Sequence, residues 1–181
     1  MEIIVYEAKD IIETPTVETG KERRTGMAGH WQGSYFYETP GRMFADGGGV
    51  DFEMDLKQDW MQRLTGHFNG TVSDYQPRGI PGVGTIEGRC RKGAIQFTKQ
   101  MPVAHVITKD GVRTLRQHLI SMGCDIGSDF PHWPMLHTGR MTGANTASGS
   151  WVMEADEVPV SMGSMVQIPK FTGTWTIYRK S

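Results

Sequence analysis

The clearest pattern in the chain is a strict alternation of apolar and polar residues between positions 50 and 56. The apolar positions are Val50, Phe52, Met54 and Leu56, and the acidic positions between them are Asp51, Glu53 and Asp55. Successive side chains of a strand point to opposite faces, so this pattern predicts a strand with one face in a core. The acidic row is either a metal site or a solvated face, and the solvated face is favoured.

Shorter apolar stretches with the same character recur from residue 29 onward. The predicted strands are 29–38, 49–60, 63–74, 83–90, 93–101, 103–109, 112–122, 135–143, 148–155 and 170–179. Spacings of about 8–20 residues with tight turns such as Lys109-Asp110-Gly111 are typical of antiparallel sandwiches and barrels. No segment predicts an amphipathic helix. We therefore expect an all-β fold, an antiparallel up-and-down β-barrel of about eight to ten strands, spanning residues 29–181.

Residues 1–28 differ from the rest of the chain. Six large apolar residues come first and a polar stretch from 14 to 26 follows; the apolar residues are Ile3, Ile4, Val5, Tyr6, Ile11 and Ile12. This number of apolar residues is high for a disordered leader. We expect residues 1–28 to form an N-terminal arm or lid, with a disordered leader as the alternative.

Composition supports a bent sheet rather than a helical bundle. The 181 residues include 23 glycines, where about 13 would be usual at about 7%. Each glycine inside a helix costs about 1 kcal/mol relative to alanine. Several glycines precede aromatic residues, as in Gly29-His30-Trp31, Gly66-His67-Phe68 and Gly173-Thr174-Trp175. We interpret these as kinks that let a sheet curl around core aromatics.

Charge and motifs exclude several function classes. With 19 Lys and Arg against 20 Asp and Glu, there is no basic surplus for nucleic acid. No apolar run approaches the roughly 18 residues of a membrane span, and the acidic N-terminus is unlike a signal peptide, so we expect a cytoplasmic protein without a membrane partner. Cys90 and Cys124 either pair or, as a reducing compartment favours, stay free thiols. No metal or cofactor motif is present, and the oligomeric state is left open, a homodimer included.

Strand parity places a few polar residues among apolar ones. These residues are Tyr35, Tyr37, Asp74, Lys99, Gln117 and His137. The predicted apolar walls are Phe68, Phe97, Met135, Met141, Trp151 and Trp175. An apolar cavity with a few convergent polar groups is the usual form of a small-molecule site, although the polar groups can instead satisfy one another. The aromatic, proline-rich loop around Trp133 is either a packed cap or part of a pocket rim.

The segment Gly29-His30-Trp31-Gln32-Gly33 resembles the G-x-W opening of the calycins, the lipocalin-like and avidin-like barrels. It also resembles the G-x-W-x-G-x-G start of the nitrobindin haem barrels. Tyr35 stands where those barrels have a third glycine, and no histidine follows His137 to ligate haem. The resemblance therefore implies a calycin-like barrel, with no cofactor expected.

The layout of a barrel with an N-terminal arm and no cofactor motif resembles the small spirotetramate and spirotetronate cyclases of natural product biosynthesis. That resemblance implies a cofactor-free Diels-Alderase that templates an intramolecular [4+2] cycloaddition of a polyketide-type polyene. Positioning alone supplies up to roughly 7–11 kcal/mol of such a barrier.

In this interpretation, Gln117 or His137 polarises a substrate carbonyl and Asp74 anchors a polar head group. Tyr35 and Lys99 join the apolar walls in binding the substrate, and Ile3, Val5 and Tyr6 of the arm close the mouth. The first alternative is a non-catalytic, lipocalin-like binder of a lipophilic ligand. The second is an interaction module whose barrel is filled with side chains.

Overall fold

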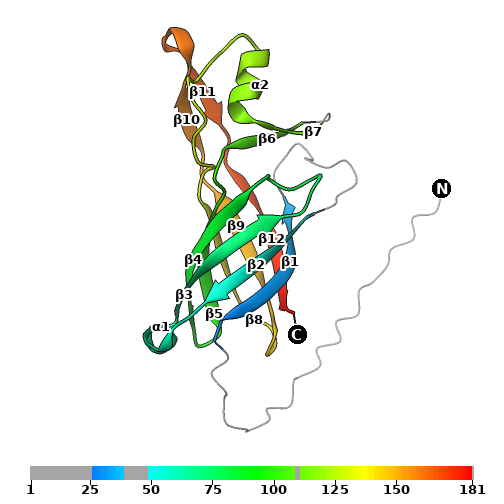
Figure 1. Cartoon of the computed structure of the whole chain (residues 1–181), viewed down its shortest axis with the longest axis vertical. Helices are drawn as coiled ribbons and strands as arrows, with labels where there is room; N and C mark the ends of the chain where they lie inside the picture. Colours follow the sequence, from blue (N-terminus) through cyan, green and yellow to red (C-terminus); the bar gives the residue numbers. More distant parts are fainter. Residues whose placement is uncertain (1–25, 39–48, 109–110, 181) are drawn as a thin grey trace, which may run out of the picture.

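The computed structural model describes residues 26–38, 49–108 and 111–180. Eight strands form a closed antiparallel barrel in the order β1-β12-β9-β8-β5-β4-β3-β2 (Figure 1). Their bounds are β1 Gly29–Tyr37, β2 Val50–Lys57, β3 His67–Asp74, β4 Val83–Arg91, β5 Ala94–Gln100, β8 Met135–Met141, β9 Thr146–Met153 and β12 Phe171–Arg179. This architecture confirms the predicted all-β class and is consistent with a calycin-like barrel.

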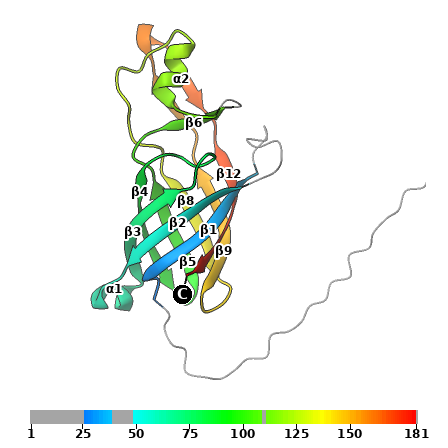
Figure 2. The same cartoon turned by 45° about the vertical axis from the view of Figure 1, so that its right-hand side comes forward.

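Two insertions extend the molecule beyond one end of the barrel (Figures 1 and 2). Between β5 and β8 lie the hairpin β6 His105–Thr108 with β7 Gly111–Thr114 and the helix α2 Leu115–Ser121. Between β9 and β12 lie the hairpin β10 Asp156–Pro159 with β11 Met165–Ile168 and the short helix η1 Ser161–Gly163. We call these insertions the cap, and the barrel end below them the cap end. The helix α1 Trp60–Thr65 marks the opposite end, the α1 end.

The alternation in β2 has the predicted consequence. Its four apolar residues are buried, none more than 5% exposed. Asp51 and Asp55 are exposed on the opposite face, and Glu53 is partly exposed. Burial of the apolar face stabilises the barrel at about 25 cal/mol per Å² of apolar surface. The acidic row is therefore a largely solvated outer face.

The two helices correct the sequence prediction, which gave 112–122 as a strand and no helix. Both helices begin with a capping box: Asp59 with Gln62 in α1, and Thr114 with Gln117 in α2. In each box the side chains satisfy backbone N–H groups that a helix start leaves unpaired. This local bonding, with Leu115 and Leu119 buried one turn apart, makes 115–121 helical.

Glycines serve two separate purposes in the barrel. At Gly173 the issue is space: a Cβ there would lie 2.7 Å from Trp151 Cε2 and nearer still to the Phe36 carbonyl oxygen. At Gly66 the issue is conformation, because this residue ends α1 with a left-handed φ of 79°. Gly173 thus allows a close approach of the backbone to the Trp151 indole on the neighbouring strand, and the kink expected beside Trp175 stays a prediction.

The described chain enters the barrel at the α1 end. Met27 is fully buried there; its N–H donates to Gln58 Oε1 (3.0 Å), and its carbonyl accepts from Trp31 Nε1 (2.8 Å). Residues 1–25 of the predicted arm, with Ile3, Val5 and Tyr6, lie outside the described residues. Over the described ranges, we find no helix with the length and apolar character needed to span a membrane.

Candidate functional site

A cavity of about 290 Å³ lies where the cap meets the cap end of the barrel. Its walls come from the barrel, the cap and the β3–β4 loop. They are Tyr37, Ile80, His105, Val106, Ile107, Leu115, His118, His132, Trp133, Met135, Trp151, Met153, Ile168, Pro169 and Phe171. Most of these side chains are apolar or aromatic. The cavity therefore has the character of a site for a small organic molecule.

Aromatic rings pack edge to face on the barrel side of the cavity. The ring centroids of Tyr37 and Trp151 are 4.9 Å apart with an interplanar angle of 86°, and those of Tyr37 and Phe171 are 6.2 Å apart at 87°. Trp151 Nε1 donates to the Phe36 carbonyl across 3.1 Å, which fixes the indole. Such packing gives a preformed wall whose rings need little reordering when a ligand binds.

Two histidines of the cavity wall are hydrogen-bonded to backbone carbonyls. His105 Nδ1 lies 2.8 Å from the Val103 carbonyl oxygen, and His132 Nδ1 lies 2.9 Å from that of Trp133. Burial lowers the pKa of His132 to about 4, so it is uncharged at neutral pH. In the part of the chain that the structure describes, no three His, Cys, Asp or Glu residues are arranged to hold a metal ion.

A charged network lies inside the barrel, next to the residues of the cavity wall. Lys99 Nζ donates to Asp74 Oδ1 in an ion pair whose side chains are 1% and 0% exposed. Asp74 Oδ2 also accepts from the Tyr35 hydroxyl (2.9 Å) and from the Ile80 N–H (3.2 Å). Lys99 Nζ lies 4.3 Å from the centroid of the Tyr35 ring and 5.5 Å from that of Phe52. The carboxylate and the ammonium are thus partnered within the core, as buried charges must be.

Burial and charge act in opposite directions on the pKa of Lys99 and in the same direction on the pKa of Tyr35. Burial lowers the pKa of Lys99, while the neighbouring Asp74 carboxylate acts to raise it. Burial also raises the pKa of Tyr35 well above its usual value, as do the nearby Tyr37 and Asp74. Tyr35 is therefore a neutral hydrogen-bond donor at physiological pH.

Tyr37 belongs both to the cavity wall and to this network. It lines the cavity, and a hydrogen bond joins it to Tyr35. Burial raises the pKa of Tyr37, and the Asp74 charge raises it further, so the Tyr37 hydroxyl keeps its proton at neutral pH. Through Tyr37, the buried polar network reaches the wall of the largely apolar cavity.

His137 lies deeper, among aromatic rings. Its imidazole stacks on Phe97 with centroids 4.4 Å apart and an interplanar angle of 9°. Nδ1 lies 2.9 Å from the Met135 carbonyl oxygen, whereas the buried Nε2 has no hydrogen-bond partner. Burial, with the nearby Lys99 charge, lowers the pKa of His137 to about 3. His137 is thus a neutral core residue and not part of the cavity wall.

Most of the sequence-predicted site residues lie inside the barrel, but few of them line the cavity. The buried ones are Tyr35, Phe68, Asp74, Phe97, Lys99, Met135, His137, Trp151 and Trp175. Of these, Met135 and Trp151 line the cavity. Met141 is half-buried and ends β8 at the α1 end. The interior position predicted for Gln117 is wrong, because this residue is exposed and caps α2.

Sequence reasoning missed most of the cap side of the cavity. Val106, Ile107, Leu115 and Ile168 line it, yet each comes from a hairpin or helix outside the barrel. One signal was available: the aromatic, proline-rich loop that contains Trp133 was a candidate pocket rim. Trp133 does line the cavity, and its indole N–H donates to Asp156 Oδ2 across 2.7 Å.

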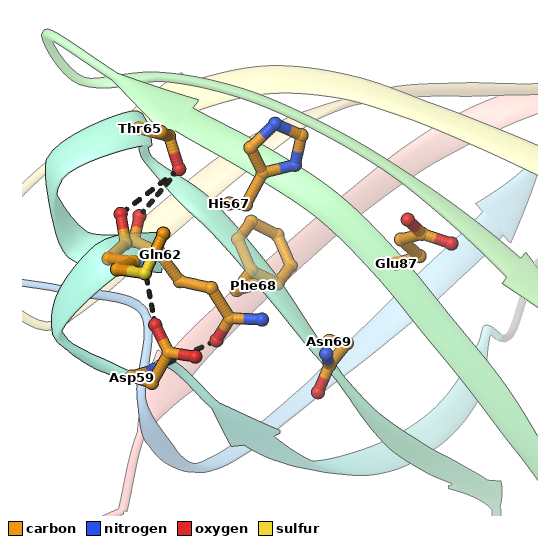
Figure 3. Close-up of a pocket in the computed structure, with 8 residues that line it drawn as sticks. Asp59, Gln62, Thr65, His67, Phe68, Asn69 and Glu87 are labelled. Atoms are coloured by element: carbon orange, nitrogen blue, oxygen red, sulfur yellow. Dashed lines mark hydrogen bonds between the residues drawn. The ribbon is translucent and has the colours of Figure 1, made fainter.

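A second hollow, of about 330 Å³, lies beside α1 (Figure 3). Its residues are Asp59, Met61, Gln62, Thr65, His67, Phe68, Asn69 and Glu87. Several of its polar groups are already bonded: Asp59 Oδ1 accepts from the Gln62 N–H (2.7 Å), and the Thr65 hydroxyl donates to the Met61 carbonyl (3.3 Å). We call this hollow the α1 groove; it offers a ligand fewer apolar walls than the cap cavity.

Comparison with known proteins adds no relative. No protein-family model matches the chain. No curated protein matches it either. The candidate site therefore stands on its geometry, and that geometry makes the cap cavity the candidate site.

Proposed function

We propose that this protein binds a small, uncharged, largely apolar organic molecule in the cap cavity. The observation that carries the proposal is the cavity itself, about 290 Å³ of space among preformed apolar and aromatic walls. An apolar protein cavity of about 150 Å³ accommodates benzene. A cavity near twice that size suits a two-ring compound.

The polar groups of the wall favour an uncharged ligand. Tyr37 carries a protonated hydroxyl, and His132 is a neutral imidazole at pH 7. A charged ligand would lose its hydration without meeting an opposite charge, which is costly in an apolar site. A hydroxyl or carbonyl on the ligand would instead form a hydrogen bond with Tyr37.

Binding accounts for the geometry better than the cofactor-free cyclisation expected from the sequence. Gln117 is exposed, and Asp74 is neutralised by Lys99 beneath the cavity. His137 bonds the Met135 carbonyl and does not line the cavity. The cyclase interpretation remains a prediction, and conversion of a bound polyene to a cyclised product would be its test.

The proposal can be tested with 1-naphthol, a two-ring phenol, by titrating it into the full chain and following tryptophan fluorescence. Saturable binding of one molecule per chain is expected. Val106→Phe should abolish it by filling the cavity. Val112→Phe is the matched control, because Val112 lies on the same hairpin without lining the cavity. Equal binding by both variants, or no saturable binding by the natural chain, would refute the proposal.

Tyr37→Phe tests the polar anchor. The variant should bind 1-naphthol about 2- to 12-fold more weakly, the effect of losing one neutral hydrogen bond of about 0.5–1.5 kcal/mol. Its affinity for naphthalene, which has no hydroxyl, should stay the same. An equal loss for both probes would mean that the substitution disturbs packing and that Tyr37 is not an anchor.

A further inference from the structure

The helix α1 presents an apolar surface to solvent. Trp60 is 72% exposed, Met61 59% and Leu64 66%, and α1 contains no buried residue. Residues three and four apart on a helix are neighbours, so Leu64 lies beside both Trp60 and Met61. We call these three side chains the α1 face. Contiguous exposed apolar side chains of this size mark an interaction surface.

The α1 face is held in a defined orientation. The Asp59–Gln62 capping box fixes the helix start, and Gly66 ends the helix with a left-handed backbone. Gln58, just before α1, donates its side-chain N–H to the His67 carbonyl across 2.8 Å. Both ends of this short helix are therefore held in place, and its apolar side has a fixed orientation.

We propose that residues 3–12 of this chain pack on the α1 face. The described chain starts at Gly26, beside α1: a Cβ on Gly26 would lie 3.6 Å from Gln58 Cδ and 4.0 Å from Arg63 Cγ. Residues 13–25, which we call the tether, can span at most about 43 Å at about 3.3 Å per residue. The six-residue helix itself is only about 9 Å long. The tether is thus ample for a return to α1.

The chemistry of the N-terminal residues matches this surface. Residues 3–12 hold six large apolar side chains, which suit packing against the exposed Trp60, Met61 and Leu64. Because both partners belong to one chain, the contact has the millimolar effective concentration that short linkers give, so even a weak contact is populated. Residues 3–12 would then cover the α1 end and would not close the cap cavity at the far end.

The accessibility of Trp60 measures this contact directly. The Trp60 signal is the difference between the natural chain and its Trp60→Phe variant. Acrylamide should quench the Trp60 signal at least threefold less in the chain with the natural N-terminus than in the full-length variant Ile3→Ser/Val5→Ser/Ile12→Ser. Thr14→Ser/Thr16→Ser in the tether is the matched control and should keep the protection. Equal quenching of Trp60 in all of these chains would overturn the proposal.

Two further readouts separate the competing occupants. Protection of Trp60 should be independent of protein concentration. If protection increased together with the fraction of dimer seen in sedimentation, a second copy would cover the α1 face, and the proposal would be overturned. The affinity for 1-naphthol should be unchanged in the triple serine variant. A loss of that affinity without a change in Trp60 quenching would place residues 3–12 at the cavity, and would also overturn it. Because this readout is separate from the probe titration, either proposal can fail alone.

Discussion

Replacing Lys99 with methionine removes one charge of the buried ion pair and keeps most of the apolar stem. Asp74 then remains buried without its ammonium partner, while the Tyr35 hydroxyl and the Ile80 N–H still donate to it. Breaking a buried pair from one side costs about 3–5 kcal/mol. Since two donors remain on the carboxylate, we expect a loss of about 3 kcal/mol. This is a large fraction of the about 5–15 kcal/mol that stabilises a typical protein.

The assay is urea unfolding at pH 7, followed by circular dichroism and tryptophan fluorescence. At a typical slope of about 2 kcal/mol per M, the midpoint of Lys99→Met should fall by about 1.5 M. The control is Lys170→Met, which removes the partner of Glu154 in a pair that is 52% and 69% exposed. Exposed pairs contribute about 0–1 kcal/mol, so that midpoint should move little.

The double variant Lys99→Met/Asp74→Asn completes the test. With both charges absent, no uncompensated charge is left in the core. The double variant should therefore lose at least about 2 kcal/mol less unfolding free energy than the two single variants lose together. Additive losses, or a Lys99→Met variant as stable as Lys170→Met, would refute the reasoning that Asp74 depends on Lys99.

Two other predictions follow from burial. In the folded protein the pKa of His132 is about 4 and that of His137 about 3. Below pH 6.5 the unfolded chain therefore binds more protons than the folded chain. Stability falls as the pH drops, by about 1.4 kcal/mol per pH unit for each histidine. His137→Gln should therefore flatten the slope of unfolding free energy between pH 6 and 4, and an unchanged slope would contradict the assignment. Gly173→Ala should lower the folding stability by about 1–3 kcal/mol in thermal unfolding, because the new methyl group would overpack against Trp151. Thr174→Ala, at the exposed neighbouring position, should lower it less. Equal losses would show that Gly173 has room for a side chain.

Local alternation was sufficient to predict which way the barrel side chains face. In β2 and β5 the period of two identifies the inward residues directly, Lys99 included. The same reasoning failed at Leu115 and Leu119, because a spacing of four is even, as in a strand, and also close to one helical turn. The capping residues Thr114 and Gln117 were the signal that distinguishes the two, and they specify a helix.

Pairing across the barrel is not readable from one sequence in the same way. Parity placed Tyr35, Asp74 and Lys99 inside, but strand order and register decide that they meet. The cavity is harder still to predict, because its walls join barrel ends to a cap made from two separate insertions. In the sequence, only the aromatic loop around Trp133 indicated part of that cap.

The most direct test of the proposed function is a crystal structure of the full chain with 4-bromo-1-naphthol. The bromine gives an anomalous signal that locates the probe without assumption. We predict one strong peak in the cap cavity, with the probe hydroxyl within hydrogen-bond distance of Tyr37. A peak confined to the α1 groove, or a cap cavity without signal at saturating probe, would contradict the account.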